Sequence, residues 1–122
     1  MIKRTITLDG TTLTSSEVFE VATNFSLVKI AEESMIRVRS ARSVVDRILQ
    51  EDEVVYGINT GFGSLVNTQI NSAELETLQL NLVRSHATGL GDLMSVEEVR
   101  AMMCVRINSL VKGNSGCHPD VI

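Results

Sequence analysis

Three capping boxes constrain the fold of this chain more than any other feature of its sequence. In a capping box, a polar side chain binds the backbone three residues later, and the Glu at that position binds back. Each box precedes apolar residues at helical spacing: Thr14-x-x-Glu17, Asn71-x-x-Glu74 and Ser95-x-x-Glu98. The boxes predict a short helix through Ala22, a second helix that ends at Gly89, and a third that Gly113 stops.

The apolar residues of the helices predict which faces are buried. The second helix is predicted to turn inward Leu75, Leu78, Leu82 and Val83, and the third carries Val99, Met102, Met103, Arg106 and Leu110. A further helix is predicted over residues 31–50, with Met35, Val38, Val45, Ile48 and Leu49 at helical spacing. Its other side is mostly charged: Arg37, Arg39, Arg42, Asp46 and Arg47. We interpret that side as solvated rather than as an anion site.

A small β element is predicted near the N-terminus. Lys3 to Leu8 alternates polar and apolar residues, and Asp9-Gly10 is a strong turn signal, so a strand and hairpin are expected there. Residues 27–30 predict a second short strand. With 122 residues the chain is expected to hold one core, and that core must be aliphatic because aromatics make up only 3%.

Charge and composition exclude several classes of function. The net charge is −4 and no cluster of Lys and Arg alternates with aromatics, so nucleic acid is not an expected partner. The first residues lack the apolar block of a signal peptide, and no apolar run approaches the roughly 18 residues that span a membrane. Two cysteines are too few for a disulfide scaffold. We therefore expect a cytoplasmic protein.

Metal binding is not expected. The zinc-type ligands are Cys104, Cys117, His86 and His118. Cys117 and His118 are adjacent, and neither Cys-x-x-Cys nor His-x-x-x-His spacing occurs.

The chain's one tyrosine, Tyr56, stands at the head of Tyr-Gly-Ile-Asn-Thr-Gly-Phe-Gly, residues 56–63. The three glycines permit an unusual backbone direction there. Their spacing does not fit a phosphate-binding loop, so that role is not predicted. Taken alone, a tyrosine beside such a loop is more often a packing residue than a base, because a phenol is a poor base at neutral pH without nearby positive charge or dipoles.

Two further segments accompany this motif in order. They are Leu-Gln-Leu-Asn-Leu-Val-Arg-Ser-His-Ala-Thr-Gly-Leu-Gly at 78–91 and Arg-Ile-Asn-Ser-Leu-Val-Lys-Gly-Asn-Ser-Gly at 106–116. Together the three resemble the signatures of the histidine and aromatic amino acid ammonia-lyases, and the resemblance runs over essentially the whole chain. It implies the ammonia-lyase fold of the fumarase/aspartase-like superfamily, mainly α with a small N-terminal β element.

The resemblance implies roles for particular residues. Tyr56 is the expected catalytic base, which removes a proton from the β-carbon of the substrate. Asn59, Thr60 and Gly61 are expected to form the wall on the substrate side. Ser85 and His86 match the pair that faces the substrate side chain. On spacing alone His86 lies at the edge of an apolar face, where a hydrogen-bonded core histidine is the commoner role.

The pair Ser85-His86 favours an imidazole substrate. Within the family, Ser-His is typical of histidine ammonia-lyases, although some bacterial tyrosine aminomutases also carry it. The resemblance therefore predicts part of an enzyme that eliminates ammonia from L-histidine to give trans-urocanate. The alternatives are a tyrosine ammonia-lyase or aminomutase, and a non-catalytic, truncated or stand-alone interaction module.

One part of the family's chemistry is missing from the 122 residues. The family's electrophile, a 4-methylidene-imidazol-5-one ring, forms from an internal Ala-Ser-Gly, and this sequence contains none. Asn114-Ser115-Gly116 is not that triplet, because its flanks match a different family segment. His118-Pro119-Asp120 reads as a helix beginning, as in the front of a longer protein.

We therefore expect residues 1–122 to be the N-terminal segment of an ammonia-lyase, inactive by itself. In the family each active site takes residues from three subunits of a homotetramer, so a homo-oligomer is expected. The expected ligand of the intact enzyme is a small amino acid.

Overall fold

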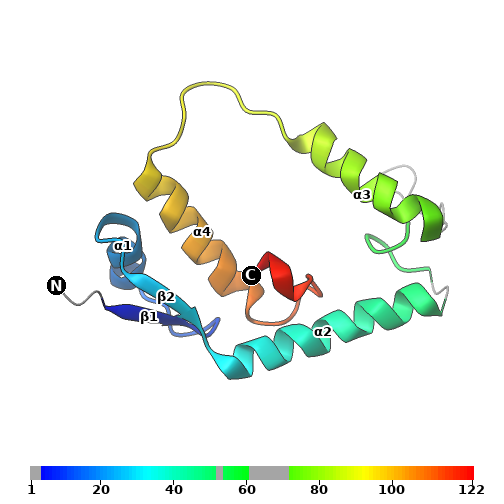
Figure 1. Ribbon diagram of the computed structural model, residues 1–122, viewed down its shortest axis with the longest axis horizontal. Coiled ribbons are helices and arrows are strands. Elements are labelled where there is room, and N and C mark those ends of the chain that lie inside the picture. The colour runs from blue at the N-terminus through cyan, green and yellow to red at the C-terminus, as the bar shows by residue number, and fades with distance from the viewer. Residues whose placement is uncertain (1–3, 52–53, 61–71) are drawn as a thin grey trace. The chain divides into compact units, whose positions relative to one another are not determined.

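The chain folds mainly into helices. The computed structural model describes residues 4–51, 54–60 and 72–122. Its elements, labelled in Figure 1, are β1 (Thr5–Leu8), α1 (Ser15–Thr23), β2 (Leu27–Ile30), α2 (Glu32–Gln50), α3 (Ser72–His86), α4 (Val96–Leu110) and the 3₁₀ helix η2 (Pro119–Val121). The prediction of a mainly α fold with a small N-terminal β element is confirmed. None of the described helices is both long and apolar enough to cross a membrane.

The contacts within the chain define two compact units, which we describe separately. Unit 1 comprises Met1–Val44 and Leu93–Ile122, and unit 2 comprises Val45–Asp92. Unit 1 therefore holds the sheet, α1, the first part of α2, and α4. Unit 2 holds the end of α2, the tyrosine motif and α3.

The two strands pair in parallel, so the predicted hairpin is wrong. Thr5 lies opposite Leu27 and Leu8 opposite Ile30. Parallel strands need a crossover connection, and α1 supplies it. At the turn after β1, the Asp9 carboxylate accepts hydrogen bonds from the backbone N–H groups of Thr11 and Thr12. The chain continues from this turn into α1 and does not return directly as a second strand.

The capping boxes of α1 and α4 form as predicted. The side chain of Thr14 accepts a hydrogen bond from the N–H of Glu17, and the Glu17 carboxylate binds back to the Thr14 N–H. Ser95 and Glu98 make the same reciprocal pair at the start of α4. The third box begins at Asn71, which lies outside the described residues.

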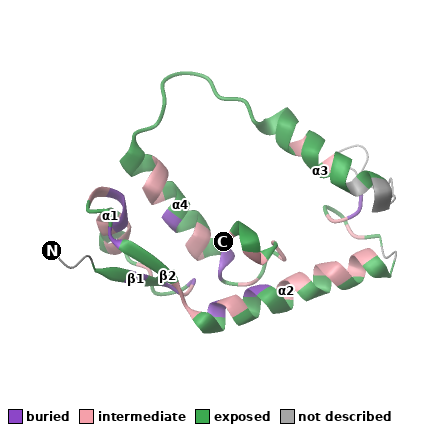
Figure 2. Ribbon diagram, viewed as in Figure 1, coloured by how far each residue is buried: buried purple, intermediate pink, exposed green. Residues whose placement is uncertain are grey.

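The core of unit 1 is aliphatic, as predicted. Its buried cluster joins β1, α1 and α4, whose buried positions appear purple in Figure 2, and consists of Ile6, Leu8, Val21, Cys104 and Val111. Arg100 anchors α4 to the end of α1, since its Nε donates to the carbonyl of Val21 at 2.9 Å. Its guanidinium also lies 4.5 Å from the ring centre of Phe25.

The buried face of α4 differs from the prediction. Met102 and Met103 are each 54% exposed, whereas Cys104 is 3% exposed. Helix α4 has apolar residues around most of its circumference, so its sequence did not identify the face that would meet the core. The prediction held for Leu110, which is buried.

Helix α3 also departs from the prediction. It ends at His86 rather than at Gly89. Val83, predicted to face inward, is 64% exposed, while Leu78 and Leu82 are half-buried. The side chain of Leu75 lies outside what the structure describes. Figure 2 shows no buried position among the α3 residues whose burial the structure describes.

Gly113 closes unit 1 where the chain leaves α4 and crosses α2. Its φ of +78° lies in the left-handed region that favours glycine. A Cβ there would stand 2.7 Å from the Cβ of Arg37 and 2.8 Å from the backbone carbon of the same residue. The position therefore requires glycine for both its conformation and its space.

We expect Gly113→Ala to lower the free energy of unfolding by about 2–5 kcal/mol, the sum of left-handed strain and overpacking. Gly91→Ala is the matched control, because Gly91 has φ +92° but no described atom near its Cβ. It should lose only the conformational part, about 1–2 kcal/mol. Urea denaturation of the two variants measures the difference, and equal losses would show that the contact with α2 is not tight.

Candidate functional site

Tyr56 lies in a tight turn of unit 2. The carbonyl of Val55 accepts hydrogen bonds from the N–H groups of Ile58 at 3.1 Å and Asn59 at 3.3 Å. Gly57 follows the tyrosine with φ +78°, in open space, so its conformation rather than its surroundings requires glycine. The Tyr56 side chain is 61% exposed. The turn therefore holds a phenol where another molecule can reach it.

Two buried polar side chains close this turn. Asn59 is 4% exposed and Thr60 is 1% exposed. The Oδ1 of Asn59 accepts the N–H of Val55 at 2.9 Å, and the Oγ1 of Thr60 accepts the N–H of Gly57 at 3.4 Å. The two donors belong to the residues on either side of Tyr56. Gly61, the other residue of the predicted wall, lies outside the described residues.

Ser85 and His86 form the last turn of α3, and both are exposed. The Oγ of Ser85 donates to the carbonyl of Leu82 at 2.9 Å. The Nδ1 of His86 lies 2.9 Å from the same carbonyl and 3.0 Å from the Ser85 Oγ. Because a carbonyl only accepts, Nδ1 carries the proton, and Nε2 is the ring nitrogen that these bonds do not use.

The structure thus assigns the predicted site residues to two places in one unit. Tyr56 and Asn59 share the turn after α2, and Ser85 with His86 ends α3; all four belong to unit 2. Their roles toward a substrate stay predictions.

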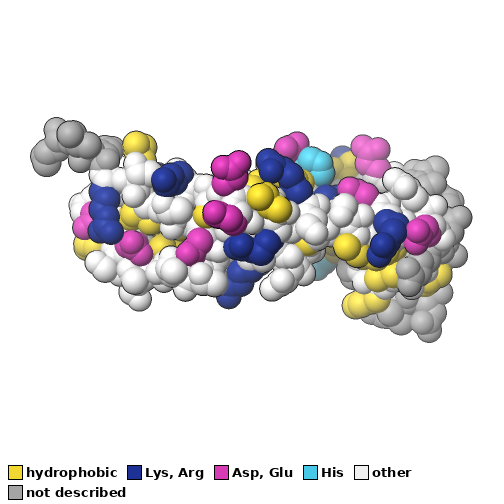
Figure 3. Space-filling model, turned by 90° about the horizontal axis from the view of Figure 1, so that it is seen from below, with side chains coloured by type: hydrophobic (Ala, Val, Ile, Leu, Met, Phe, Trp, Pro, Cys, Tyr) yellow, Lys and Arg dark blue, Asp and Glu magenta, His cyan; other side chains and the backbone are white. Residues whose placement is uncertain are grey.

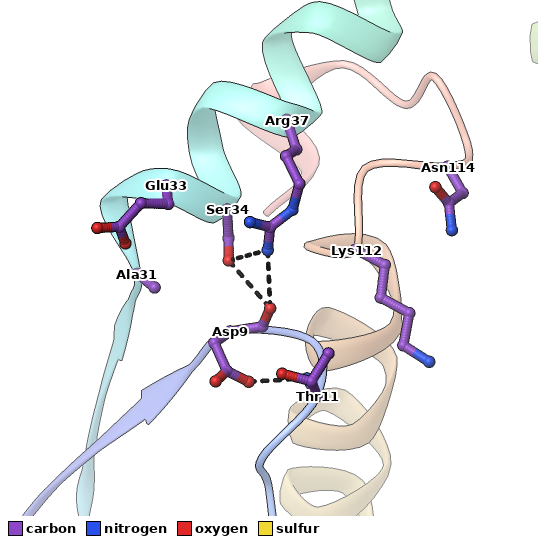
Figure 4. A pocket seen from close by; sticks show the side chains of 8 residues that line it. All are labelled: Asp9, Thr11, Ala31, Glu33, Ser34, Arg37, Lys112 and Asn114. Atoms are coloured by element: carbon purple, nitrogen blue, oxygen red, sulfur yellow. Dashed lines mark hydrogen bonds between the residues drawn. The ribbon is translucent and has the colours of Figure 1, made fainter.

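A second polar site lies in unit 1 and was not predicted. It is a cavity of about 530 Å³ lined by Asp9, Thr11, Ala31, Glu33, Ser34, Arg37, Lys112 and Asn114 (Figure 4). The Nη2 of Arg37 donates to the carbonyl of Asp9 at 3.0 Å and to the Oγ of Ser34 at 2.7 Å. Ser34 itself donates to the Asp9 carbonyl at 3.0 Å.

These bonds tie α2 to the turn after β1. The lining residues include two carboxylates and two cations, so no single sign of charge gathers there to attract an ion. Figure 3 likewise shows charged groups of both signs interspersed over the face that it presents. We interpret the cavity as a structural junction. Sequence alone gave no signal for it, because Asp9 lies 25 and 28 residues from its partners Ser34 and Arg37.

The carboxylate of Asp9 organises the same turn. It accepts hydrogen bonds from the N–H groups of Thr11 at 2.7 Å and Thr12 at 2.8 Å, and from the Thr12 hydroxyl at 2.7 Å. All three stabilise the charged form, and those from the backbone contribute most, so the pKa of Asp9 lies well below its ordinary value.

This lowered pKa makes stability depend on pH. A carboxyl whose folded pKa is depressed stabilises the fold above its unfolded pKa and loses that contribution as pH falls toward its folded pKa. We expect the stability advantage of the unmodified chain over Asp9→Asn to be constant above about pH 5 and to shrink below about pH 4. Urea denaturation of both proteins across this range measures it. An advantage that does not change with pH would contradict the role of the Asp9 charge.

The cysteines do not form part of either site. Cys104 belongs to the core of unit 1, and burial raises the pKa of its thiol, an effect that Arg100 opposes. Among the described residues, no group of three or more His, Cys, Asp or Glu is placed to hold a metal ion.

Comparison with known proteins places these observations in a family. The family model described as aromatic amino acid lyase matches residues 13–122. The histidine ammonia-lyase of Streptococcus gordonii is 48% identical over 111 residues, which make up 91% of this chain and 22% of that protein.

Two solved structures share the fold. Histidine ammonia-lyase from Trypanosoma cruzi matches with a TM-score of 0.88 and 38% identity, over 95% of this chain and 23% of that one. Tyrosine aminomutase from Streptomyces globisporus matches with a TM-score of 0.88 and 33% identity, over 98% of this chain and 22% of that one. The chain thus spans less than a quarter of the length of these relatives.

Proposed function

Because the chain belongs to the aromatic amino acid lyase family, we propose that it is the N-terminal part of an ammonia-lyase acting on L-histidine. The product is trans-urocanate, and the reaction releases ammonia. The observation that carries this proposal is the 48% identity, over 91% of the chain, with an enzyme named histidine ammonia-lyase.

Tyr56 is the base in this proposal. Its phenolate oxygen takes a proton from the β-carbon of histidine, the released electron pair forms the double bond to the α-carbon, and the bond to the amino nitrogen breaks. The exposure of Tyr56 in a turn built around glycine supports this role, because the base must reach the substrate.

His86 recognises the substrate ring. With Nδ1 committed to the carbonyl of Leu82, Nε2 can accept the N–H of the substrate imidazole. Ser85 holds the His86 ring through its Oγ. Asn59 and Gly61 contribute to the wall beside the reacting carbon.

The electrophile comes from elsewhere. The family's 4-methylidene-imidazol-5-one, when present, activates the amino group for departure. Its Ala-Ser-Gly precursor does not occur in these 122 residues, so the residues present do not supply the ring. We propose that the complete enzyme is a homo-oligomer in which other segments provide it.

A second candidate is a tyrosine ammonia-lyase or aminomutase. The 33% identity with a tyrosine aminomutase over 98% of the chain favours it over more distant functions. The same base would serve, and the difference would lie in the residues that meet the side chain.

The proposal is tested with a hybrid lyase. In it, the aligned 111-residue segment of the S. gordonii enzyme is replaced by the matching residues of this chain. We expect the hybrid lyase to form urocanate from L-histidine, detected by its ultraviolet absorbance, and the 122-residue chain alone to form none. Turnover by the chain alone would overturn the account of the missing electrophile. A folded hybrid that forms coumarate or β-tyrosine from tyrosine, but no urocanate, would favour the second candidate.

A further inference from the structure

We propose that Asn59 and Thr60 are positioning residues, whose side-chain oxygens orient the Tyr56 phenol by fixing the backbone on either side of it. The proposal rests on the proposed function of Tyr56 as the base. It adds a role for two side chains that do not themselves exchange a proton with substrate.

The hydrogen bonds of the turn hold both peptide planes that flank Tyr56. The plane before it contains the Val55 carbonyl, which the N–H groups of Ile58 and Asn59 bind. The plane after it contains the Gly57 N–H, which donates to the Oγ1 of Thr60 at 3.4 Å. Because peptide units are planar, fixing both planes fixes φ and ψ of the residue between them. The direction of the Cα–Cβ bond of Tyr56 follows.

Asn59 makes two hydrogen bonds to Val55, the residue before Tyr56. Its backbone N–H donates to the Val55 carbonyl at 3.3 Å, and its Oδ1 accepts the Val55 N–H at 2.9 Å. Asn59 therefore sets where the turn begins, and Thr60 sets how the chain leaves the tyrosine.

Packing alone does not hold the phenol. The Tyr56 side chain is 61% exposed, so unit 2 covers less than half of it. Gly57 has φ +78°, and glycine has the greatest backbone freedom of all residue types. A hydrogen bond to its N–H therefore restricts the backbone more than it would at another residue. Both partners of the turn are buried, at 4% and 1% exposure for Asn59 and Thr60, where water competes least for their oxygens.

Thr60 provides the cleaner test, because it binds Gly57 through its side-chain oxygen, whereas Asn59 binds Val55 through both its side chain and its backbone. In the hybrid lyase, Thr60→Val keeps the shape but removes the acceptor, and Thr60→Ser keeps the acceptor. We expect Thr60→Val to lower kcat about 10–100-fold with little change in KM, because a base displaced by a fraction of an ångström transfers protons poorly. Thr60→Ser should retain most of the rate. Thr60→Ala replaces Thr60→Val if the latter does not fold.

The decisive measurement repeats Thr60→Val in a Tyr56→Phe background. A residue that acts through the phenol has nothing left to position there, so the second change should lower kcat no further. The isotope effect with β-deuterated histidine should rise in Thr60→Val alone, since proton transfer becomes slower. If Thr60→Val lowers kcat by the same factor in both backgrounds, Thr60 is merely structural and the proposal fails while the base assignment stands. If Tyr56→Phe alone keeps a near-normal kcat, the proposed function fails instead.

Discussion

Changing Tyr56 to Phe in the hybrid lyase should lower kcat for L-histidine by at least about 10²–10⁴-fold, the usual contribution of a general acid–base group. The substitution removes only the hydroxyl. The hydrogen bonds from Val55 and Gly57 to the side chains of Asn59 and Thr60, and those to the Val55 carbonyl, do not include that hydroxyl. The fold should therefore survive while proton transfer fails.

The control for Tyr56→Phe is to verify that the variant still folds and still forms the electrophilic ring. Its thermal unfolding, and its ultraviolet signature of the electrophilic ring, should match those of the unmodified hybrid lyase. A near-normal kcat would show that another group removes the proton.

Changing His86 to Leu should alter substrate preference more than the rate of the chemical step. A leucine cannot accept a hydrogen bond from the N–H of the substrate imidazole. A buried donor left without a partner weakens binding by about 1–3 kcal/mol. We expect the ratio of kcat/KM for histidine to that for tyrosine to fall about 5–150-fold. Steady-state kinetics with both amino acids measure this ratio.

Ser85→Ala is the matched control for His86→Leu. It removes the hydroxyl that lies 3.0 Å from the His86 Nδ1 but leaves the bond to the Leu82 carbonyl. Its effect on the ratio should be smaller. If His86→Leu leaves the ratio unchanged, the ring does not recognise imidazole, and Ser85-His86 carries no information about the substrate.

The residues of the candidate site could be predicted from the sequence because they occur in two short segments. Tyr56, Asn59 and Gly61 lie within six consecutive residues, and Ser85 adjoins His86. The family motifs predict roles for them directly. What the motif did not reveal is which way Asn59 and Thr60 turn. Their oxygens bind backbone N–H groups within the turn, a geometry that only the folded chain displays.

Local sequence by itself determined where helices begin and which residues a core could use. The boxes at Thr14 and Ser95 predicted α1 and α4, because a cap needs only the residues within one turn of it. Scarce aromatics likewise predicted an aliphatic core.

Tertiary structure alone decided the parallel pairing of β1 with β2, the face of α4 that is buried, and the junction of Asp9 with Ser34 and Arg37. Each of these joins segments distant in sequence. The turn signal at Asp9 is compatible with a hairpin or a crossover, and a helix apolar on several sides can bury any of them. Such choices depend on how much apolar surface distant segments bury together, and a local sequence pattern does not reveal that total area.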